Sequence, residues 1–310
     1  MTRRELLEIA AAASMVRPAA AANVAAQVKP HTGTPTLFLN GKPAFSGAFW
    51  VPGPSVEKWE SAASSRRAAE AGVHTYAFDV ASGVEWRGPG AGHDGDFDFS
   101  TVERRFGRVI DVDPEARFHL RCQLEIGADD WWSKLYPGEL EVHSNGRRYT
   151  QSFASTIWRE QANAFLRAYI AHLRRVGLLD RVIAFQVGAG HTGEWVKGET
   201  SMYEVCGDYS EPMRRAFRQW LARRYRDDAS LRSGWGDANA AMDRAEVPSA
   251  AEQLETRKGT FRDAKREART IDYFRCLADL SADAVIDFCR TVKQAAGADK
   301  LAGAFYGYLM

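Results

Sequence analysis

Short apolar runs alternate with longer amphipathic stretches along most of this chain. The apolar runs are too short for helices and are rich in Val, Ile and aromatic residues; they cover residues 44–50, 73–80, 117–125, 181–188 and 301–308. The stretches between them have helical composition and cover residues 55–72, 100–111, 155–176, 211–225 and 262–296. Strands alternating with helices predict an α/β fold with a parallel sheet. Such a series fits either an open doubly wound sheet or the first five units of a (β/α)8 TIM-type barrel.

The run at residues 117–125 favours the barrel. Its alternating positions form an apolar set and a polar set: Phe118, Leu120, Cys122 and Leu124 against His119, Arg121, Gln123 and Glu125. In a barrel wrapped by helices the outward face is apolar, so the polar set points into the lumen and toward its C-terminal mouth. An edge strand with one hydrated face is the other explanation of this pattern.

The same alternation brings further side chains to that mouth. It predicts that Asp79, Gln186, Tyr306 and Tyr308 point inward with Arg121 and Glu125. Trp50 ends the first strand and is either a platform for a sugar ring or a core residue. Ser100, with Glu103 three residues later, has the spacing of a helix N-cap.

A glycine-rich loop follows the fourth strand and presents one carboxylate beside one tryptophan. Gly188, Gly190 and Gly193 allow sharp turns and leave room for a ligand. Glu194 can give or take a proton, and Trp195 can stack on the apolar face of a sugar. His191 either touches the substrate or is structural. A surface loop with a solvated Glu194 and a packing Trp195 is the alternative.

The N-terminus suggests export. Arg3 and Arg4 precede a weakly apolar stretch at residues 9–16, and small residues offer cleavage sites near Ala22 or Ala26. We therefore expect a twin-arginine-like leader over residues 1–28 and a periplasmic or extracellular protein; a frayed alanine-rich helix is the alternative. Residues 29–43 then form a linker and a small hairpin whose turn is Asn40-Gly41.

Charge and motifs exclude several classes of function. The 41 basic and 40 acidic residues give a net charge of +1, which exerts no long-range attraction on nucleic acid or acidic membranes, and no later stretch is apolar enough for membrane insertion. No GxGxxG follows the first strand and no GxxxxGK[ST] occurs, so we expect no nucleotide cofactor. The polar residues 226–260 look like an insertion: a lid, an oligomer contact or disorder.

Metal and disulfide chemistry are also disfavoured. Cys122, Cys206, Cys276 and Cys289 show no metal-ligand spacing and are expected to be buried thiols, with a disulfide left open if the chain is exported. A metal-dependent hydrolase using His191, Glu194 and Asp79 lacks the usual histidine spacing, so no metal is expected.

Four segments carry a resemblance to a known family: Phe97-Asp-Phe-Ser100, Arg117-Phe-His-Leu-Arg121, Gly190-His-Thr-Gly-Glu-Trp195 and Gly303-Ala-Phe-Tyr-Gly-Tyr308. Together they resemble the catalytic barrel of clan A glycoside hydrolases, nearest to the β-galactosidase-like and family 42-like enzymes. The resemblance implies that Glu194 is the acid/base residue. Many members have Asn directly before it, whereas this chain has Gly193. A Gly-Glu pair at this place also resembles β-amylase-type barrels, which leaves inverting chemistry open.

The resemblance further implies a nucleophile after strand seven, which no residue here matches. We therefore expect residues 44–310 to be a partial barrel from the N-terminal part of a glycosidase that cleaves oligo- or polysaccharides. A complete protein with an open five-stranded sheet is the alternative. The second carboxylate is either missing or is Glu125 or Asp79. A non-catalytic carbohydrate-binding barrel would keep the aromatic lining without the acid pair.

Overall fold

Five parallel strands form the central sheet. A computed structural model describes residues 23–51, 62–81, 83–92, 95–127, 130–190, 193–196, 206–256, 259 and 261–305. In these ranges the strands lie in the order β10-β9-β6-β5-β4. Their bounds are β4 (Phe49–Trp50), β5 (Thr75–Ala81), β6 (Arg117–Gln123), β9 (Val182–Gly188) and β10 (Leu301–Gly303).

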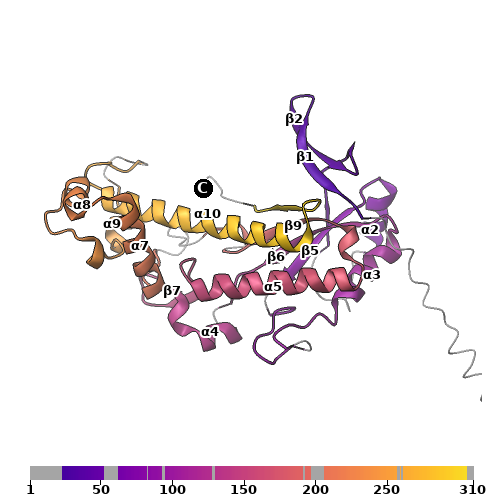
Figure 1. Cartoon of the computed structure of the whole chain (residues 1–310), viewed down its shortest axis with the longest axis horizontal. Helices are drawn as coiled ribbons and strands as arrows, with labels where there is room; N and C mark the ends of the chain where they lie inside the picture. The colour runs from indigo at the N-terminus through magenta and orange to yellow at the C-terminus, as the bar shows by residue number, and fades with distance from the viewer. Residues whose placement is uncertain are drawn as a thin grey trace, which may run out of the picture.

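Successive strands of this sheet are neighbours in space, and a helix precedes each new strand. The connecting helices are α2 (Ala62–Glu70), α3 (Val102–Val112), α5 (Thr156–Arg175) and α10 (Ala268–Ala296). A doubly wound sheet reverses its strand order at a switch point, and this sheet does not. Right-handed crossovers that step in one direction leave all helices on one face, as in a barrel wall. Figure 1 shows α5 and α10 running side by side along the sheet.

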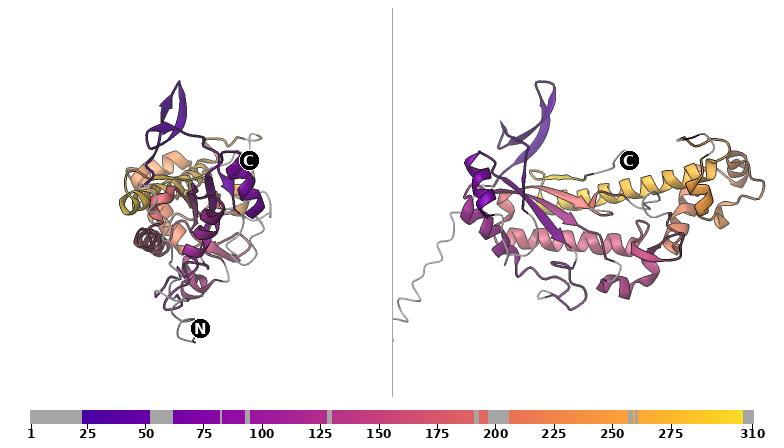
Figure 2. Two further views of the ribbon diagram at one scale, coloured as in Figure 1. Left: turned by 90° about the vertical axis from the view of Figure 1, so that its right-hand side faces the viewer. Right: turned by 180° about the vertical axis from the view of Figure 1, so that it is seen from behind.

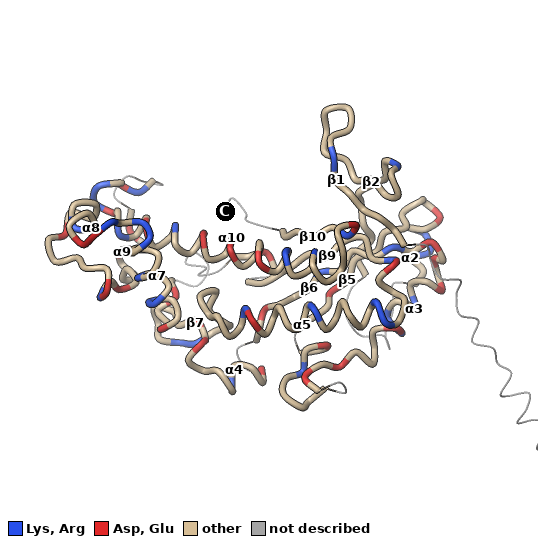
Figure 3. Tube along the Cα trace, viewed as in Figure 1, with Lys and Arg blue, Asp and Glu red and all other residues tan. Residues whose placement is uncertain are grey.

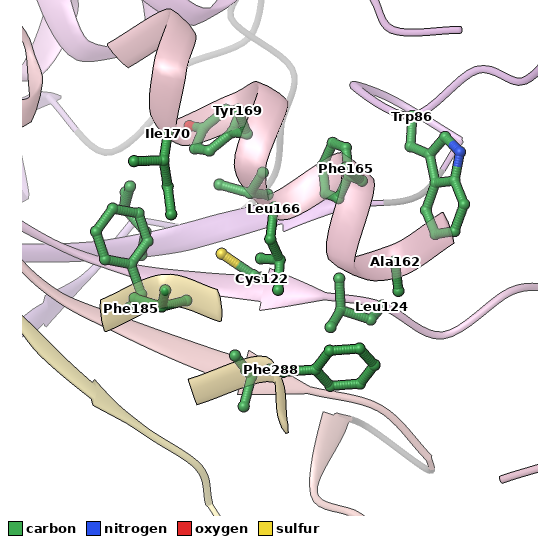
Figure 4. Packing of buried hydrophobic residues seen from close by; sticks show 14 of the residues in the cluster. Trp86, Cys122, Leu124, Ala162, Phe165, Leu166, Tyr169, Ile170, Phe185 and Phe288 are labelled. Carbon is green, nitrogen blue, oxygen red and sulfur yellow. The ribbon is translucent and has the colours of Figure 1, made fainter. Parts of the chain in front are cut away.

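Strand β6 lies in the middle of the sheet, between β5 and β9, so it is not an edge strand. Phe118, Leu120 and Cys122 are fully buried, whereas the side chains between them are only half-buried, which confirms the predicted alternation. The apolar side packs against α5, whose Ala162, Phe165 and Leu166 belong to the same buried cluster as Cys122 and Leu124 (Figure 4). The sheet therefore buries one face under helices and leaves the other face polar.

Local sequence signals explain the helix starts, with one correction. Ser155 precedes α5, and its side chain accepts the backbone N–H of Trp158 at 3.1 Å. The residue before α3 is Thr101, not the expected Ser100. The hydroxyl of Ser100 instead donates to Asp98 Oδ1 at 2.6 Å, in a turn that ends before the helix begins.

The N-terminal hairpin is larger than expected. Strands β1 (Ala26–His31), β2 (Thr34–Leu39) and β3 (Lys42–Pro43) form a small antiparallel sheet that projects from the body (Figures 1 and 2). The Asn40-Gly41 turn is confirmed, with φ of 48° and 80°. The boundary expected at residue 28 is wrong, because it falls inside β1.

The base of this hairpin is held by the barrel. The backbone N–H groups of Val24 and Ala26 donate to the carbonyls of Asp180 and Asp299, at 2.9 and 2.8 Å. The buried ammonium of Lys300 donates to the Val24 carbonyl at 2.9 Å. The folded region therefore begins before the boundary that composition suggested.

The polar insertion is a folded helical lobe over its described residues 226–256. Helices α7 (Glu211–Arg224), α8 (Asp228–Trp235) and α9 (Ala250–Leu254) precede α10, and a separate apolar cluster joins α7 and α8 to α10. Disorder is thus excluded for that part of the insertion. Buried Asp272 on α10 accepts the Tyr225 hydroxyl at 2.6 Å and the Trp235 indole N–H at 2.9 Å.

The lobe lies at the end of the molecule toward which the sheet strands point (Figure 1). The remaining short elements there are α4 (Trp131–Leu135), β7 (Leu140–Val142) and β8 (Arg148–Gln151). Short 3-10 turns cover Pro137–Glu139, Leu179–Arg181 and Met242–Arg244. The backbone N–H of Tyr209 donates to the Val142 carbonyl at 2.7 Å, which ties the lobe to the barrel.

Two further expectations are revised or confirmed. The first sheet strand covers only Phe49–Trp50, and Phe45, expected in a buried strand, is 70% exposed. All four cysteines are free thiols, and Cys289 is the one that is only half-buried.

Within the described ranges, no helix combines the length and apolar character that a membrane crossing requires.

A buried ion pair braces the segment after β5. Glu85 is fully buried, accepts the Ala81 N–H at 2.9 Å, and is paired with Arg105 of α3. The same guanidinium donates to the backbone carbonyl of Asp79. Burial raises the pKa of Glu85 even though Arg105 opposes this change. The charged form of Glu85 therefore depends on the neighbouring guanidinium of Arg105.

Replacing Arg105 with Met should lower the free energy of unfolding by about 3–5 kcal/mol, because it leaves Glu85 buried without its partner. Urea denaturation measures the change. The matched control is Arg104→Met, an exposed neighbour on α3, which should change stability by no more than about 0.5 kcal/mol. Adding Glu85→Gln to the Arg105 variant should recover part of the loss. Equal stability of the two arginine variants would contradict this role.

Candidate functional site

A row of polar side chains crosses the inner face of the sheet. Asp79 of β5, Arg121 of β6 and Gln186 of β9 are aligned in register, as the alternation predicted. The guanidinium of Arg121 donates to both carboxylate oxygens of Asp79, with Nε–Oδ1 at 2.6 Å and Nη2–Oδ2 at 3.1 Å. Both side chains keep a quarter or more of their surface exposed, at 25% and 29%. This pair is therefore a fixed, accessible element of the inner face.

Trp50 extends this row at the end of β4. The Arg121 guanidinium carbon lies 4.6 Å from the centroid of the Trp50 ring, a cation–π geometry. The Trp50 side chain is 41% exposed, so it is not a core residue. The core role left open for Trp50 is therefore excluded, and its role as a sugar platform stays a prediction.

Glu194 lies in a tight loop beyond the carboxyl end of β9. Gly190 and Gly193 have φ of 77° and 80°, and Trp195 has φ of 62°. The Gly193 N–H donates to the Gly190 carbonyl at 3.0 Å, and the Trp195 N–H donates to the Ala189 carbonyl at 2.7 Å. Glu194 is half-buried between these turns. A positive φ at Trp195 costs free energy, so the surrounding contacts must enforce it.

Trp195 supplies those contacts and is a core residue. Its ring is 5% exposed, and its indole N–H donates to the Val187 carbonyl at 2.9 Å. The ring centroids of Phe153 and Phe288 lie 5.3 and 6.1 Å away. The stacking role expected for Trp195 is therefore wrong in this structure: the ring anchors the loop, and Glu194 is the residue that it positions.

Glu125 holds the same loop from the other side. Its Oε2 accepts the Gly190 N–H at 2.6 Å and the Gln151 side-chain amide at 2.7 Å. The carboxylate is half-buried. These two hydrogen bonds give Glu125 a loop-holding role, whereas the sequence had placed it at the barrel mouth as a candidate for the second carboxylate.

Gln186 lines an open pocket of about 320 Å³ on the inner face, together with His119, Val28 and Phe305. His191, Tyr306 and Tyr308 lie outside the described residues, so their predicted roles stay predictions. The structure thus brings Trp50, Asp79, Arg121 and Gln186 together on the inner face of one sheet, and Glu125 holds the loop that carries Glu194 beyond the carboxyl end of β9.

Two residues of this face were not recognised as site residues from the sequence. Gln123 ends β6, and its amide Nε2 lies 3.4 Å from Asp79 Oδ1. His119 lies two positions before Arg121 and lines the pocket. Burial lowers the pKa of His119, and the nearby Arg121 charge adds to this effect. Their shared parity with Arg121 was the signal that could have identified them.

The chemistry of the site is that of carboxylates and an aromatic platform. Over the described residues, no group of three or more His, Cys, Asp or Glu side chains has the arrangement of a metal site. A half-buried Glu194 at a barrel mouth suits proton transfer, and the exposed Trp50 suits the apolar face of a ring-shaped ligand.

Solved structures with a similar fold include β-galactosidases and a β-amylase. The β-galactosidase from the psychrophilic Marinomonas ef1 matches with a TM-score of 0.58 and 16% identity, over 82% of this chain and 36% of that chain. Gan42B, a GH42 β-galactosidase from G. stearothermophilus, matches with a TM-score of 0.56 and 15% identity, over 82% of this chain and 34% of that chain. The catalytic domain of a β-amylase from Paenibacillus polymyxa matches with a TM-score of 0.62 and 14% identity, over 80% of this chain and 62% of that chain.

These matches confirm a partial TIM-type barrel, and with it the resemblance to clan A glycosidases at the level of the fold. No protein-family model matches the sequence, and no curated protein sequence matches it. The chain spans 36% of the length of the Marinomonas enzyme, well under two thirds. The chain therefore has a TIM-barrel-type α/β fold, which these glycosidases share.

His119 gives the site a testable pH dependence. Its pKa in the folded state lies below the ordinary value of 6.5, so the unfolded chain binds a proton first as the pH falls. This histidine therefore lowers the stability as the pH drops below 6.5. We expect His119→Asn to flatten the fall in unfolding free energy between about pH 7 and pH 5, in urea titrations. The exposed His31→Asn is the control; an unchanged slope in the His119 variant would refute the assignment.

Proposed function

We propose that this chain is the N-terminal part of the catalytic barrel of a glycoside hydrolase, with Glu194 as the acid/base residue. The observation that carries the proposal is the position of Glu194. It follows the fourth strand of the sheet, and its loop is fixed by the Trp195 anchor and by Glu125. Active sites of barrel enzymes lie at the carboxyl ends of their strands.

The mechanism assigns proton transfer to Glu194. In glycoside hydrolysis one carboxylic acid protonates the leaving oxygen, and a second carboxylate acts as the nucleophile or activates water. A proton donor at neutral pH needs a partly desolvated carboxyl group. The half-buried position of Glu194 beside the buried Trp195 supports this role.

We place the second carboxylate outside the described residues. Asp79 uses both oxygens to bind Arg121, and Glu125 uses one oxygen to hold Gly190 and Gln151. Each of these carboxylates thus has a structural task before any substrate binds. Strands β4 and β10 are the edges of the described sheet, and barrel closure would require further strands between them.

The substrate that we propose is a neutral sugar, with β-galactosides as the first candidates. The Arg121 charge is compensated by Asp79, and the two further ionisable residues near the mouth, Glu125 and Glu194, are both acidic. An anionic sugar would meet no uncompensated cation among these four residues. Trp50 beside Arg121 offers the aromatic surface for the sugar ring. The similar structures that are β-galactosidases support this choice.

A non-catalytic carbohydrate-binding barrel is the second candidate, because Trp50 and Arg121 could bind a sugar without any bond cleavage. Glu194 separates the two functions. An enzyme needs its carboxyl group for turnover, whereas a binding protein does not.

Titration with methyl β-D-galactoside should shift the NMR signal of the Trp50 indole N–H, and Trp50→Ala should weaken sugar binding. Glu194→Gln should keep this binding. It should also reduce hydrolysis of an aryl β-D-galactoside by about 100-fold or more, because the proton donor is lost. The hydrolysis assay is run on the full chain alone and on the full chain joined to the segment that we propose completes the barrel.

The control is Glu160→Gln, an exposed acid on α5. Sugar binding without hydrolysis in the unaltered protein would favour the binding protein, and normal turnover in the Glu194 variant would contradict the proton-transfer role of Glu194. Absence of any sugar effect on Trp50 would contradict both functions.

We also propose that the protein is exported by a twin-arginine-like leader. The arginine pair at Arg3 and Arg4, the apolar residues 9–16 and the small residues that follow support this proposal. The bonded base of β1 limits where such a leader can end, because Val24 and Ala26 belong to the folded body.

Mass spectrometry of the exported protein should find a mature N-terminus near Ala22 or Asn23, and not after Ala26. Cleavage after Ala26 would remove the buried Val24 and Ala26 and the Lys300 contacts, and so destabilise the hairpin. Replacing both Arg3 and Arg4 with Lys should retain the uncleaved chain in the cytoplasm. Continued export of that double variant would overturn the proposed route.

A further inference from the structure

The side chain of Gln123 fills the space above two glycines that flank the Glu194 loop. Gln123 and Gly188 are partners in register across β6 and β9. A Cβ atom on Gly188 would lie 3.0 Å from Gln123 Oε1, and a Cβ atom on Gly193 would lie 2.6 Å from Gln123 Nε2. Both separations are shorter than ordinary van der Waals contact. The Gln123 amide therefore lies directly against the backbone of Gly193, the residue that precedes Glu194.

The other contact of this amide reaches the substrate side of the site. Gln123 Nε2 lies 3.4 Å from Asp79 Oδ1, the oxygen that also accepts Arg121 Nε at 2.6 Å. Arg121 in turn lies against Trp50. A single side chain thus joins the proposed sugar platform to the loop that carries the proposed proton donor.

We propose that Gln123 is the positioning residue of Glu194, and that its amide takes the place of a side chain that residue 193 lacks. Many clan A glycosidases carry an Asn amide directly before the acid/base residue, whereas here the amide comes from β6 and the loop contributes Gly193. The catalytic meaning of this assignment rests on the proposed function. The contacts of Gln123 with Gly188, Gly193 and Asp79 stand without it.

If this assignment holds, the side chains at positions 123 and 193 compete for the same space. A side chain at residue 193 is compatible with the loop only when residue 123 is small. Asn suits such an exchange, since it tolerates the positive φ of 80° found at Gly193 better than most residues do. The arrangement therefore predicts that the double variant keeps the loop conformation and that each single variant disturbs it.

The test compares Gln123→Ala, Gly193→Asn and the double variant. Each single variant should speed hydrogen exchange of the Trp195 backbone amide, which is bonded to Ala189, by about tenfold or more. The double variant should return the exchange rate to within about threefold of the original. The matched control is Gln27→Ala, an exposed glutamine on β1, which should leave the rate unchanged.

Gln123→Met keeps the bulk of the side chain without the amide and guards against a variant that fails to fold. It should shift the carboxyl titration of Glu194, followed by carbon NMR, while Trp50 still reports sugar binding. The proposal is overturned if the Trp195 amide keeps its protection in both the Ala and Met variants, or if the double variant exchanges as fast as the singles. If the exchange results hold but no sugar binds, only the proposed function fails.

Discussion

The two-sided character of strand β6 is the constraint on which this architecture depends. Burial of Phe118, Leu120 and Cys122 beneath the helices forces His119, Arg121 and Gln123 to the opposite face. β6 lies between β5 and β9, so the same choice fixes the register of their inner side chains. A one-residue slip would bury the charged row and expose the apolar one. The polar inner face thus follows from hydrophobic burial on the outer face.

The loop after β9 shows how core packing positions a chemical group at a distance. Glu194 sits between two residues with positive φ, an arrangement that the local sequence does not favour at Trp195. The buried indole, bonded to Val187 and packed on Phe153, offsets that cost. The residue that looked like a ligand platform is therefore the one that holds the loop in place.

Charge is arranged in compensated units, and acidic and basic residues are interspersed along the chain (Figure 3). Glu85 and Arg105 neutralise each other beneath β5, and Asp79 and Arg121 do so on its inner face. Both pairs involve β5, one through the Asp79 carbonyl and one through its side chain. The site is consequently rigid on the side of the proposed sugar platform, which suits recognition of an uncharged ligand.

Much of this structure follows from the sequence alone. Period-two alternation predicted β6 and its inward row, Ser155 predicted the start of α5, and Asn40-Gly41 predicted a hairpin turn; all three signals act within a few residues. The place of Glu194 after the fourth strand also followed from the order of the elements, and the alternation along residues 117–125 favoured the barrel over an open sheet. Tertiary structure alone decided that β1 is part of the fold, that Trp195 is buried, and that the Gln123 amide covers Gly193. These outcomes depend on contacts between segments far apart in the chain, and no local pattern encodes which of two possible partners a tryptophan or an amide will meet.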